Sequence, residues 1–130
     1  MQALAAAVDL ELADRLRAGP RGVETLAEET GCATEALRRL LRALCALEVC
    51  RECPDGRFAL GPAGRCLSRD AGPDDPGLRD LVLWWSGPMW SLWGELGASV
   101  RSGQSARERL TGRAAYGFLE GDERRAALFH

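Results

Sequence analysis

The chain has 130 residues, of which 46% are hydrophobic and 28% are charged, as expected for a single folded domain. Its net charge of −2 gives no general attraction to nucleic acid or to an acidic membrane, and no apolar run approaches the roughly 18 residues of a membrane span. The N-terminal segment has no basic cluster and is interrupted by Asp9, Glu11 and Asp14. It therefore predicts an amphipathic helix rather than a signal peptide, and a cytoplasmic protein.

Helical periodicity dominates the first part of the chain. Apolar residues recur at helical spacing over 3–17, and Gly19-Pro20 ends that helix. A short helix over 23–30 ends at Gly31. The helix over 34–47 has the clearest pattern, with a stripe made of Leu37, Leu40, Leu41, Leu44 and Leu47. Two helices joined by a short turn with glycine predict a helix-turn-helix.

The pattern then changes to that of strands. Residues 49–53 and 57–60 flank the turn Pro54-Asp55-Gly56, where proline presets φ and glycine accepts a positive φ. A hairpin directly after a helix-turn-helix is the wing of a winged helix, and a short helix over 62–67 follows it. We therefore predict a mainly α fold: a winged helix-turn-helix with a two-stranded β wing, plus C-terminal helices.

A polar linker over 68–77, rich in proline, glycine and aspartate, separates the two parts of the chain. Gly87-Pro88 divides the next apolar segment into helices over 77–86 and 88–101, because proline suits the first helical position. Further helices are expected over 113–119 and from Asp122.

All four tryptophans lie between residues 84 and 93. Trp85, Met89, Trp90 and Trp93 are the candidate substrate-binding residues, since aromatic and methionine side chains form flat, adaptable walls for an aromatic ligand. Met89 and Trp90, just after the Gly-Pro break, are the first candidates. The alternative is that the cluster packs in a core or a dimer interface, because tryptophan usually buries most of its area.

Catalytic and metal-binding patterns are not found. Cys50 and Cys53 have CxxC spacing, but there is no second such pair and His130 is the only histidine, whereas a structural zinc site takes four ligands. No Ser/His/Asp or Cys/His set can be assembled. Without a signal peptide, the five cysteines are not expected to form disulfides.

Three arginines suggest a possible DNA-reading face. Arg38, Arg39 and Arg42 lie on the second helix of the helix-turn-helix, which enters the major groove in winged-helix regulators. However, glutamates surround them in an acidic chain, and the same topology also serves as a packing scaffold. A solvated arginine face is the simpler interpretation.

The order of local sequences resembles one family. The matching stretches are LADRLRAGPRGVETLAEETG, ALRRLLRALCALEV, DGRFALGPAGRCL, LRDLVLWWSGPMWSLWGELGASVRSGQSA and GRAAYGFLEGDERRAALF. Together they are similar to the N-terminal portion of the S-adenosylmethionine-dependent small-molecule O-methyltransferases, of the acetylserotonin, plant phenolic and polyketide type.

This resemblance implies a winged-helix-like dimerisation region over 1–67, the linker over 68–77, and a Trp-rich helical region over 78–130 that leads to a Rossmann-like catalytic domain. In the family, helices of two subunits interlock and this region forms one wall of the substrate pocket. The glycine-rich cofactor loop and the histidine base belong to the catalytic domain. This chain has no GxGxxG-like run in a strand-loop-helix setting, and His130 is not carried over as the base.

The resemblance implies that this chain contains no catalytic or cofactor-binding residue, so the chain alone is expected to be inactive. It also implies that S-adenosylmethionine is the cofactor of the missing domain. Expected partners are a second copy or a separate methyltransferase catalytic chain, with a small aromatic substrate and neither membrane nor nucleic acid. Family members usually carry a further helical stretch before the segment that matches Met1, so part of the dimer interface is expected to be missing. A winged-helix transcriptional regulator and a stand-alone, non-catalytic adaptor or ligand-binding protein are the alternative hypotheses.

Overall fold

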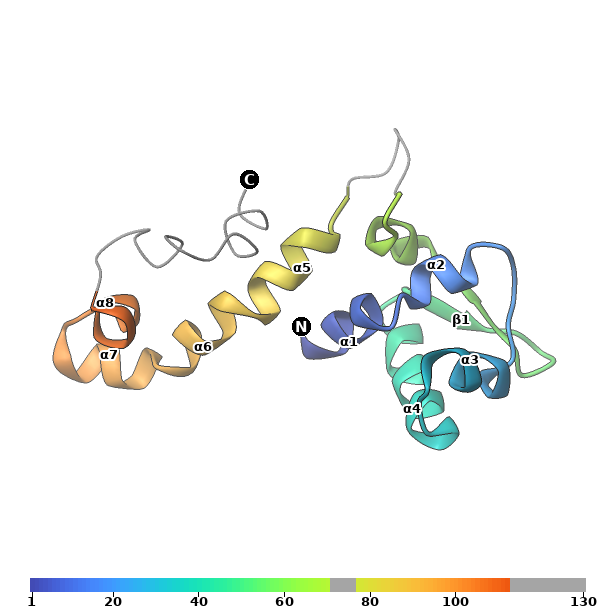
Figure 1. Cartoon of the computed structure of the whole chain (residues 1–130), viewed down its shortest axis with the longest axis horizontal. Helices are drawn as coiled ribbons and strands as arrows, with labels where there is room; N and C mark the ends of the chain where they lie inside the picture. The colour runs from blue at the N-terminus through green and yellow to red at the C-terminus, as the bar shows by residue number, and fades with distance from the viewer. Residues whose placement is uncertain (71–76, 113–130) are drawn as a thin grey trace. The chain divides into compact units, whose positions relative to one another are not determined.

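The computed structural model describes residues 1–70 and 77–112, which form helices and one two-stranded antiparallel sheet (Figure 1). The chain divides into two compact units, Met1–Arg79 and Asp80–His130. Among the described helices, none combines the length and the apolar character needed to cross a bilayer. The predicted mainly α fold with a small β wing is confirmed.

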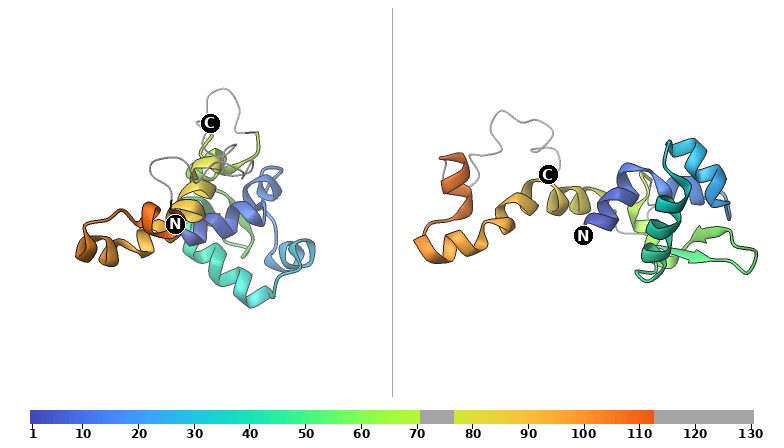
Figure 2. Two further views of the ribbon diagram at one scale, coloured as in Figure 1. Left: turned by 60° about the vertical axis from the view of Figure 1, so that its left-hand side comes forward. Right: turned by 90° about the horizontal axis from the view of Figure 1, so that it is seen from below.

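The first unit contains two N-terminal helices, a helix-turn-helix, a hairpin and a 3-10 helix. These are α1 (Gln2–Asp9), α2 (Leu12–Leu16), α3 (Val23–Thr30), α4 (Thr34–Cys45), β1 (Cys50–Glu52), β2 (Phe58–Leu60) and η1 (Pro62–Leu67). The strands pair with Arg51 opposite Ala59 and lie beside α4 (Figure 2). The backbone of Arg21 also exchanges two hydrogen bonds of 2.8 Å with Phe58. The loop after α2 thereby extends the sheet by one bridge.

Helix α4 is the centre of the first unit. Its residues Leu37, Leu41 and Leu44 are buried, and α4 contacts α1, α3 and β1. Burying each leucine stabilises the fold by roughly 2 kcal/mol. The other large side chains that are fully buried are Leu12, Leu16, Leu26, Val8, Val23 and Phe58. Of the stripe predicted in the sequence, Leu37, Leu41 and Leu44 therefore belong to the core, whereas Leu40 is only partly buried.

The predicted helix over 34–47 ends earlier than expected, at Cys45. The amide of Val49 donates to the carbonyl of Leu44 over 3.1 Å, and Glu48 adopts a left-handed φ of 58°. Because the chain turns there toward β1, Leu47 is 49% exposed. The buried stripe on α4 thus stops at Leu44, and the placement of Leu47 in it was wrong.

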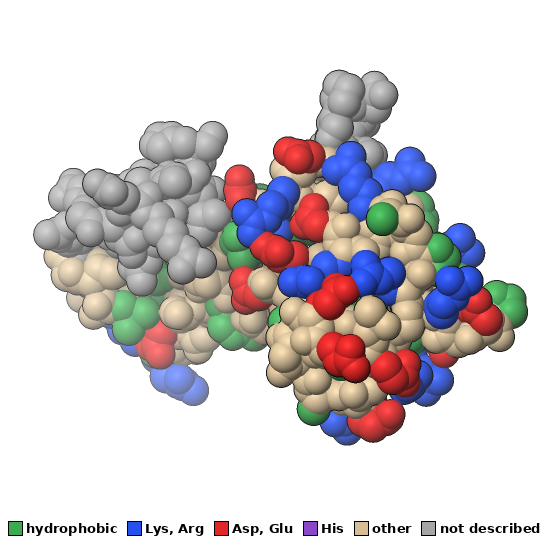
Figure 3. Space-filling view, turned by 45° about the vertical axis from the view of Figure 1, so that its right-hand side comes forward, with side chains coloured by type: hydrophobic (Ala, Val, Ile, Leu, Met, Phe, Trp, Pro, Cys, Tyr) green, Lys and Arg blue, Asp and Glu red, His purple; other side chains and the backbone are tan. Residues whose placement is uncertain are grey.

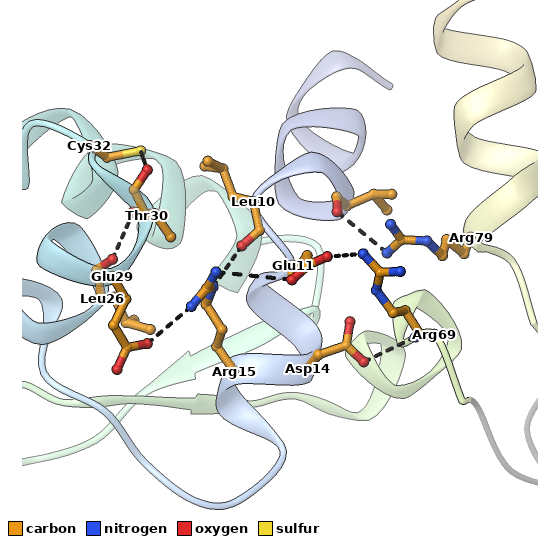
Figure 4. Close-up of polar contacts among 11 residues, drawn as sticks. Leu10, Glu11, Asp14, Arg15, Leu26, Glu29, Thr30, Cys32, Arg69 and Arg79 are labelled. Atoms are coloured by element: carbon orange, nitrogen blue, oxygen red, sulfur yellow. Dashed lines mark hydrogen bonds and ion pairs between the residues drawn. The ribbon is translucent and has the colours of Figure 1, made fainter.

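The predicted helix over 3–17 is broken at Glu11, between α1 and α2. Glu11 has a left-handed φ of 54°, which is unfavourable for a residue with a side chain. Figure 4 shows its carboxylate bound by Arg69 and facing Arg15. The amide of Arg69 also donates to Asp14 Oδ1 over 3.0 Å. Contacts from a distant part of the chain therefore hold the break in place.

The hydrogen bond and the positive charge of Arg69 lower the pKa of the Glu11 carboxyl, with smaller contributions from Arg15 and Arg79. Arg79 also donates to the carbonyl of Val8 over 3.4 Å. The residues that follow η1 are thus attached to α1 and α2. On the face that Figure 3 shows, arginine and acidic side chains lie beside one another rather than in a single basic patch.

Two glycines let the segment after the hairpin approach the end of α4 closely. A Cβ atom at Gly61 would lie 2.2 Å from the carbonyl oxygen of Glu48, and one at Gly64 would lie 2.3 Å from that of Val49. The amide of Gly61 donates to the carbonyl of Val49 over 2.8 Å. Backbone therefore packs directly on backbone at this point, which leaves no space for a side chain.

The second unit is helical throughout its described part. Its elements are α5 (Arg79–Ser86), α6 (Pro88–Gly94), α7 (Leu96–Ser102) and α8 (Ala106–Thr111), where α5 begins at the boundary between the units. The Gly87-Pro88 break is confirmed, but the single helix predicted over 88–101 is divided at Glu95. The helices expected over 113–119 and from Asp122 lie outside the described residues.

Gly61→Ala should destabilise the chain, because the new methyl group would overlap the backbone at Glu48. Overpacking of this kind typically costs about 1–3 kcal/mol, measurable by urea denaturation. Gly77→Ala is the matched control, since a Cβ atom there meets nothing within 4 Å. Equal stability of Gly61→Ala and the wild type would contradict the close approach.

Glu11→Gln should make the stability of the chain less dependent on pH in the acidic range. The pKa of Glu11 is lowered from 4.5 in the folded state, so its ion pairs stabilise the fold above that pH and are lost as the pH falls through the folded-state pKa. The variant should be less stable than the wild type at neutral pH, and the difference should disappear in acid. Glu28→Gln, on the exposed face of α3, should show no such trend in thermal melts.

Candidate functional site

The tryptophan-rich segment forms part of the wall of an open cavity of about 480 Å³ within the second unit. This volume lies in the range of small-molecule sites. The described residues that line it are Trp85, Met89, Leu92, Trp93, Leu96, Ser99, Ser105, Ala106 and Arg107. Helices α5, α6, α7 and α8 each contribute to the wall, and α8 contacts both α6 and α7.

Two indole rings form the aromatic side of the cavity. Trp85 on α5 and Trp93 on α6 have ring centroids 6.4 Å apart and an angle of 21° between their planes. This offset stacking is favourable for aromatic pairs. The rings are 38% and 56% exposed, so their remaining faces are accessible to a flat ligand.

The four candidate residues have different positions. Trp85, Met89 and Trp93 line the cavity, whereas Trp90 is not among the described lining residues and is 53% exposed. Met89 is buried together with Trp84, and Leu92 packs against them. The Gly87-Pro88 break therefore turns Met89 toward the cavity and leaves Trp90 at the surface.

The polar residues of the cavity wall were not predicted from the sequence. Ser99 on α7, and Ser105, Ala106 and Arg107 at the start of α8, all line the cavity. Helix α8 was not predicted, although Ser105 and Glu108 have the spacing of a capping box. Ser105 Oγ indeed accepts a hydrogen bond from the amide of Glu108 over 3.1 Å. That short local signal could have located the helix.

An ion pair holds α8 against the start of α7. Arg109 donates to Glu95 Oε2 over 2.5 Å, with both side chains partly buried. Glu95 is also the residue at which the predicted helix over 88–101 is divided. Its backbone N–H donates a hydrogen bond to the carbonyl of Leu92, three residues earlier, over 3.2 Å. This contact brings α8, and with it Arg107, next to the apolar wall.

Two of the three arginines of α4 form ion pairs within the fold, whereas Arg39 is exposed. Arg38 pairs with Glu24 and Glu35 at 2.9 and 3.3 Å, and Arg42 pairs with Glu52 at 3.3 Å. A helix that reads DNA needs such side chains free for bases and phosphates. The hypothesis of a DNA-binding regulator therefore receives no support from this face.

The CxxC segment has the features of packing rather than of reactivity. Burial raises the pKa of the Cys50 thiol to about 12, with a smaller effect from Cys45, and a protonated thiol is a poor nucleophile and metal ligand. Within residues 1–70 and 77–112, no three His, Cys, Asp or Glu side chains are arranged to hold a metal ion.

Comparisons with known proteins identify the family. Residues 1–70 match the O-methyltransferase dimerisation domain. O-methyltransferase SfmM3 of Streptomyces lavendulae is 36% identical over 128 residues, which are 98% of this chain and 37% of that protein.

Solved structures agree with the sequence match. The N,N-8-amino-8-demethyl-D-riboflavin dimethyltransferase of Streptomyces davawensis has a TM-score of 0.80 and 32% identity over 98% of this chain and 37% of its own. CalO1, a methyltransferase of calicheamicin biosynthesis with SAH bound, has a TM-score of 0.80 and 34% identity over 98% of this chain and 38% of its own. This chain belongs to the O-methyltransferase family and spans a little over a third of the length of these relatives.

The described residues do not fit the cofactor of that family, S-adenosylmethionine. Their sheet is a single antiparallel hairpin, whereas the family's cofactor loop follows a strand and opens a helix. Gly61 and Gly64, which follow β2, face backbone oxygens at contact distance. They leave no open cradle for a ligand, so no reaction step is assigned to these residues.

Ser105→Ala should loosen α8, because the amide of Glu108 loses its acceptor. Loss of such a helix cap costs about 1 kcal/mol, and amide hydrogen exchange over Ala106–Thr111 should accelerate accordingly. Ser91→Ala, on the exposed face of α6, is the control. Unchanged protection of the Glu108 amide would contradict the cap.

Proposed function

We propose that this chain is the dimerisation and substrate-wall region of an S-adenosylmethionine-dependent methyltransferase that acts on a planar aromatic compound. One observation carries the proposal: a cavity walled by Trp85, Met89 and Trp93 in a chain that belongs to this family. The relative from Streptomyces davawensis acts on a riboflavin derivative, whose fused rings are planar. A stacked pair of indoles suits a substrate of the same shape.

The chemistry of methyl transfer would come from a Rossmann-like domain, either in the same protein or in a separate chain. The described residues that line the cavity include no histidine, aspartate or glutamate, so they offer no general base. In the proposed division of labour, this region binds and orients the acceptor ring and excludes water. The catalytic domain supplies the cofactor and the base.

The proposal includes a homodimer, which is supported by the match of residues 1–70 to the dimerisation domain and by the exposed apolar side chains of this chain. Several large apolar residues of the second unit are at least half exposed: Leu81, Trp90, Trp93, Leu96, Val100 and Leu110. Val100 alone is 76% exposed. Apolar surface of this kind gains stability when a partner covers it.

Titration calorimetry with 2-naphthamide, a neutral planar probe, tests the aromatic wall. Trp93→Ala should weaken binding about tenfold, because one stacked ring is worth roughly 1–3 kcal/mol. Trp90→Ala is the matched control, since Trp90 and Trp93 are 53% and 56% exposed but only Trp93 lines the cavity.

The outcomes separate the possible binding surfaces. Binding that depends on Trp93 and not on Trp90 supports the cavity. Binding that depends on Trp90, one of the two first candidates from the sequence, would move the site to the exposed side of α6 that carries this residue. Absence of any binding by 2-naphthamide would contradict the proposed substrate wall.

A further inference from the structure

Helices α1 and α2 meet at a bend that the local sequence does not require. No glycine or proline lies between Gln2 and Leu16, and residues 3–17 have the periodicity of one continuous helix. The structure instead bends the chain at Glu11, which adopts a left-handed φ of 54°. That conformation is unfavourable for a residue with a Cβ atom, so tertiary contacts hold the bend.

Arginine side chains bind backbone carbonyls at the bend. The carbonyl of Leu10 accepts a hydrogen bond from Arg15 Nε over 3.0 Å, and that of Val8 accepts one from Arg79 Nη1 over 3.4 Å. In a continuous helix each of these carbonyls would bond to the amide four residues later. Figure 4 shows both arginines at the junction. The side chains thereby compensate for the interrupted helical hydrogen bonds.

The segment after η1 is attached to the junction itself. Arg69 binds the carboxylate of Glu11, and the amide of Arg69 donates to Asp14 Oδ1 over 3.0 Å. Next to it, Arg17 Nη1 donates to the carbonyl of Asp70 over 2.6 Å. The start of the predicted linker is therefore bound both to the bent residue and to α2.

The two helices are anchored unequally in the core. Helix α2 contributes Leu12 and Leu16, which are 0% and 1% exposed, and it contacts β2 and η1. The buried face of α1 consists of smaller side chains, namely Ala5, Ala7 and Val8. Straightening of the junction would therefore displace α1 rather than α2, because less apolar area is then exposed to water.

We propose that the α1–α2 junction is a two-state hinge controlled by Arg69. While Arg69 holds Glu11, the chain is bent and α1 packs against α4. When this contact is released, residue 11 becomes right-handed and residues 2–16 form one continuous helix. The hinge thereby transmits a displacement of the segment after η1 to α1, and it acts independently of the aromatic site.

Two substitutions of Glu11 separate the bend from the loss of charge. Glu11→Ala and Glu11→Gly both remove the carboxylate, but only glycine adopts a left-handed φ without a steric cost. Glu11→Ala should therefore straighten the junction and Glu11→Gly should keep it bent, with a difference of roughly tenfold in the equilibrium between the two states.

Amide hydrogen exchange followed by NMR in the 130-residue chain distinguishes the two states. The first amides of a helix have no partner within it, and in the bent chain these are the amides of Leu12, Ala13 and Asp14. A continuous helix would bond each of them to the carbonyl four residues earlier. Their exchange should therefore be about tenfold slower in Glu11→Ala than in Glu11→Gly.

Arg69→Gln tests the control of the hinge without changing the backbone preference of residue 11. It should slow the exchange of the same three amides relative to the wild type. It should also weaken the strong NOE between the amide and Hα protons of Glu11, which lie close together at positive φ. Arg65→Gln, which replaces an exposed arginine of η1, is the matched control and should change neither measurement.

Each outcome decides the proposal. Slower exchange in Arg69→Gln but not in Arg65→Gln supports the hinge. A residue 11 that stays left-handed in Arg69→Gln would overturn it, because core packing alone would then hold the bend. Equal changes in Arg65→Gln would assign the effect to charge in general and would also overturn it. If Glu11→Ala does not fold, the comparison of the two arginine variants decides.

Discussion

The first unit depends on the burial of one side of α4. Leu37, Leu41 and Leu44 are withdrawn from water, and α1, α3 and β1 pack against this helix. The backbone contact at Gly61 then brings the segment after the hairpin onto the end of α4. Hydrophobic burial therefore positions the helices and the hairpin around α4, while Gly61 allows the segment after the hairpin to approach the end of α4 closely.

The same helix-turn-helix topology serves DNA binding in other proteins, but the side chains decide its use here. Arg38 and Arg42 on α4 are held by glutamates of α3, α4 and β1. Exposed ion pairs of this kind contribute little stability, but they place a glutamate beside two of the three arginines, where it would repel a phosphate. The proposed role of the wing and helices as a scaffold for dimerisation agrees with the domain family that residues 1–70 match.

The second unit buries fewer of its apolar side chains than the first unit does. In its described part only Val82, Trp84 and Met89 are buried, while most of its large apolar side chains remain exposed. Such a surface is suited to contact with something else, and the proposed roles in dimerisation and in binding an aromatic substrate each use part of it.

Local signals let the sequence alone determine much of the fold. The bounds of α3, the stop at Gly31, the hairpin turn at Gly56 and the Gly87-Pro88 break each depend on residues within a few positions, so they could be predicted. The breaks at Glu11 and Glu95 could not, because their arginine partners lie 58 and 14 residues away. The same holds for the site: tryptophans three positions apart look equivalent in the sequence, and only the docking of α8 decided that Trp93, not Trp90, lines a cavity with Arg107.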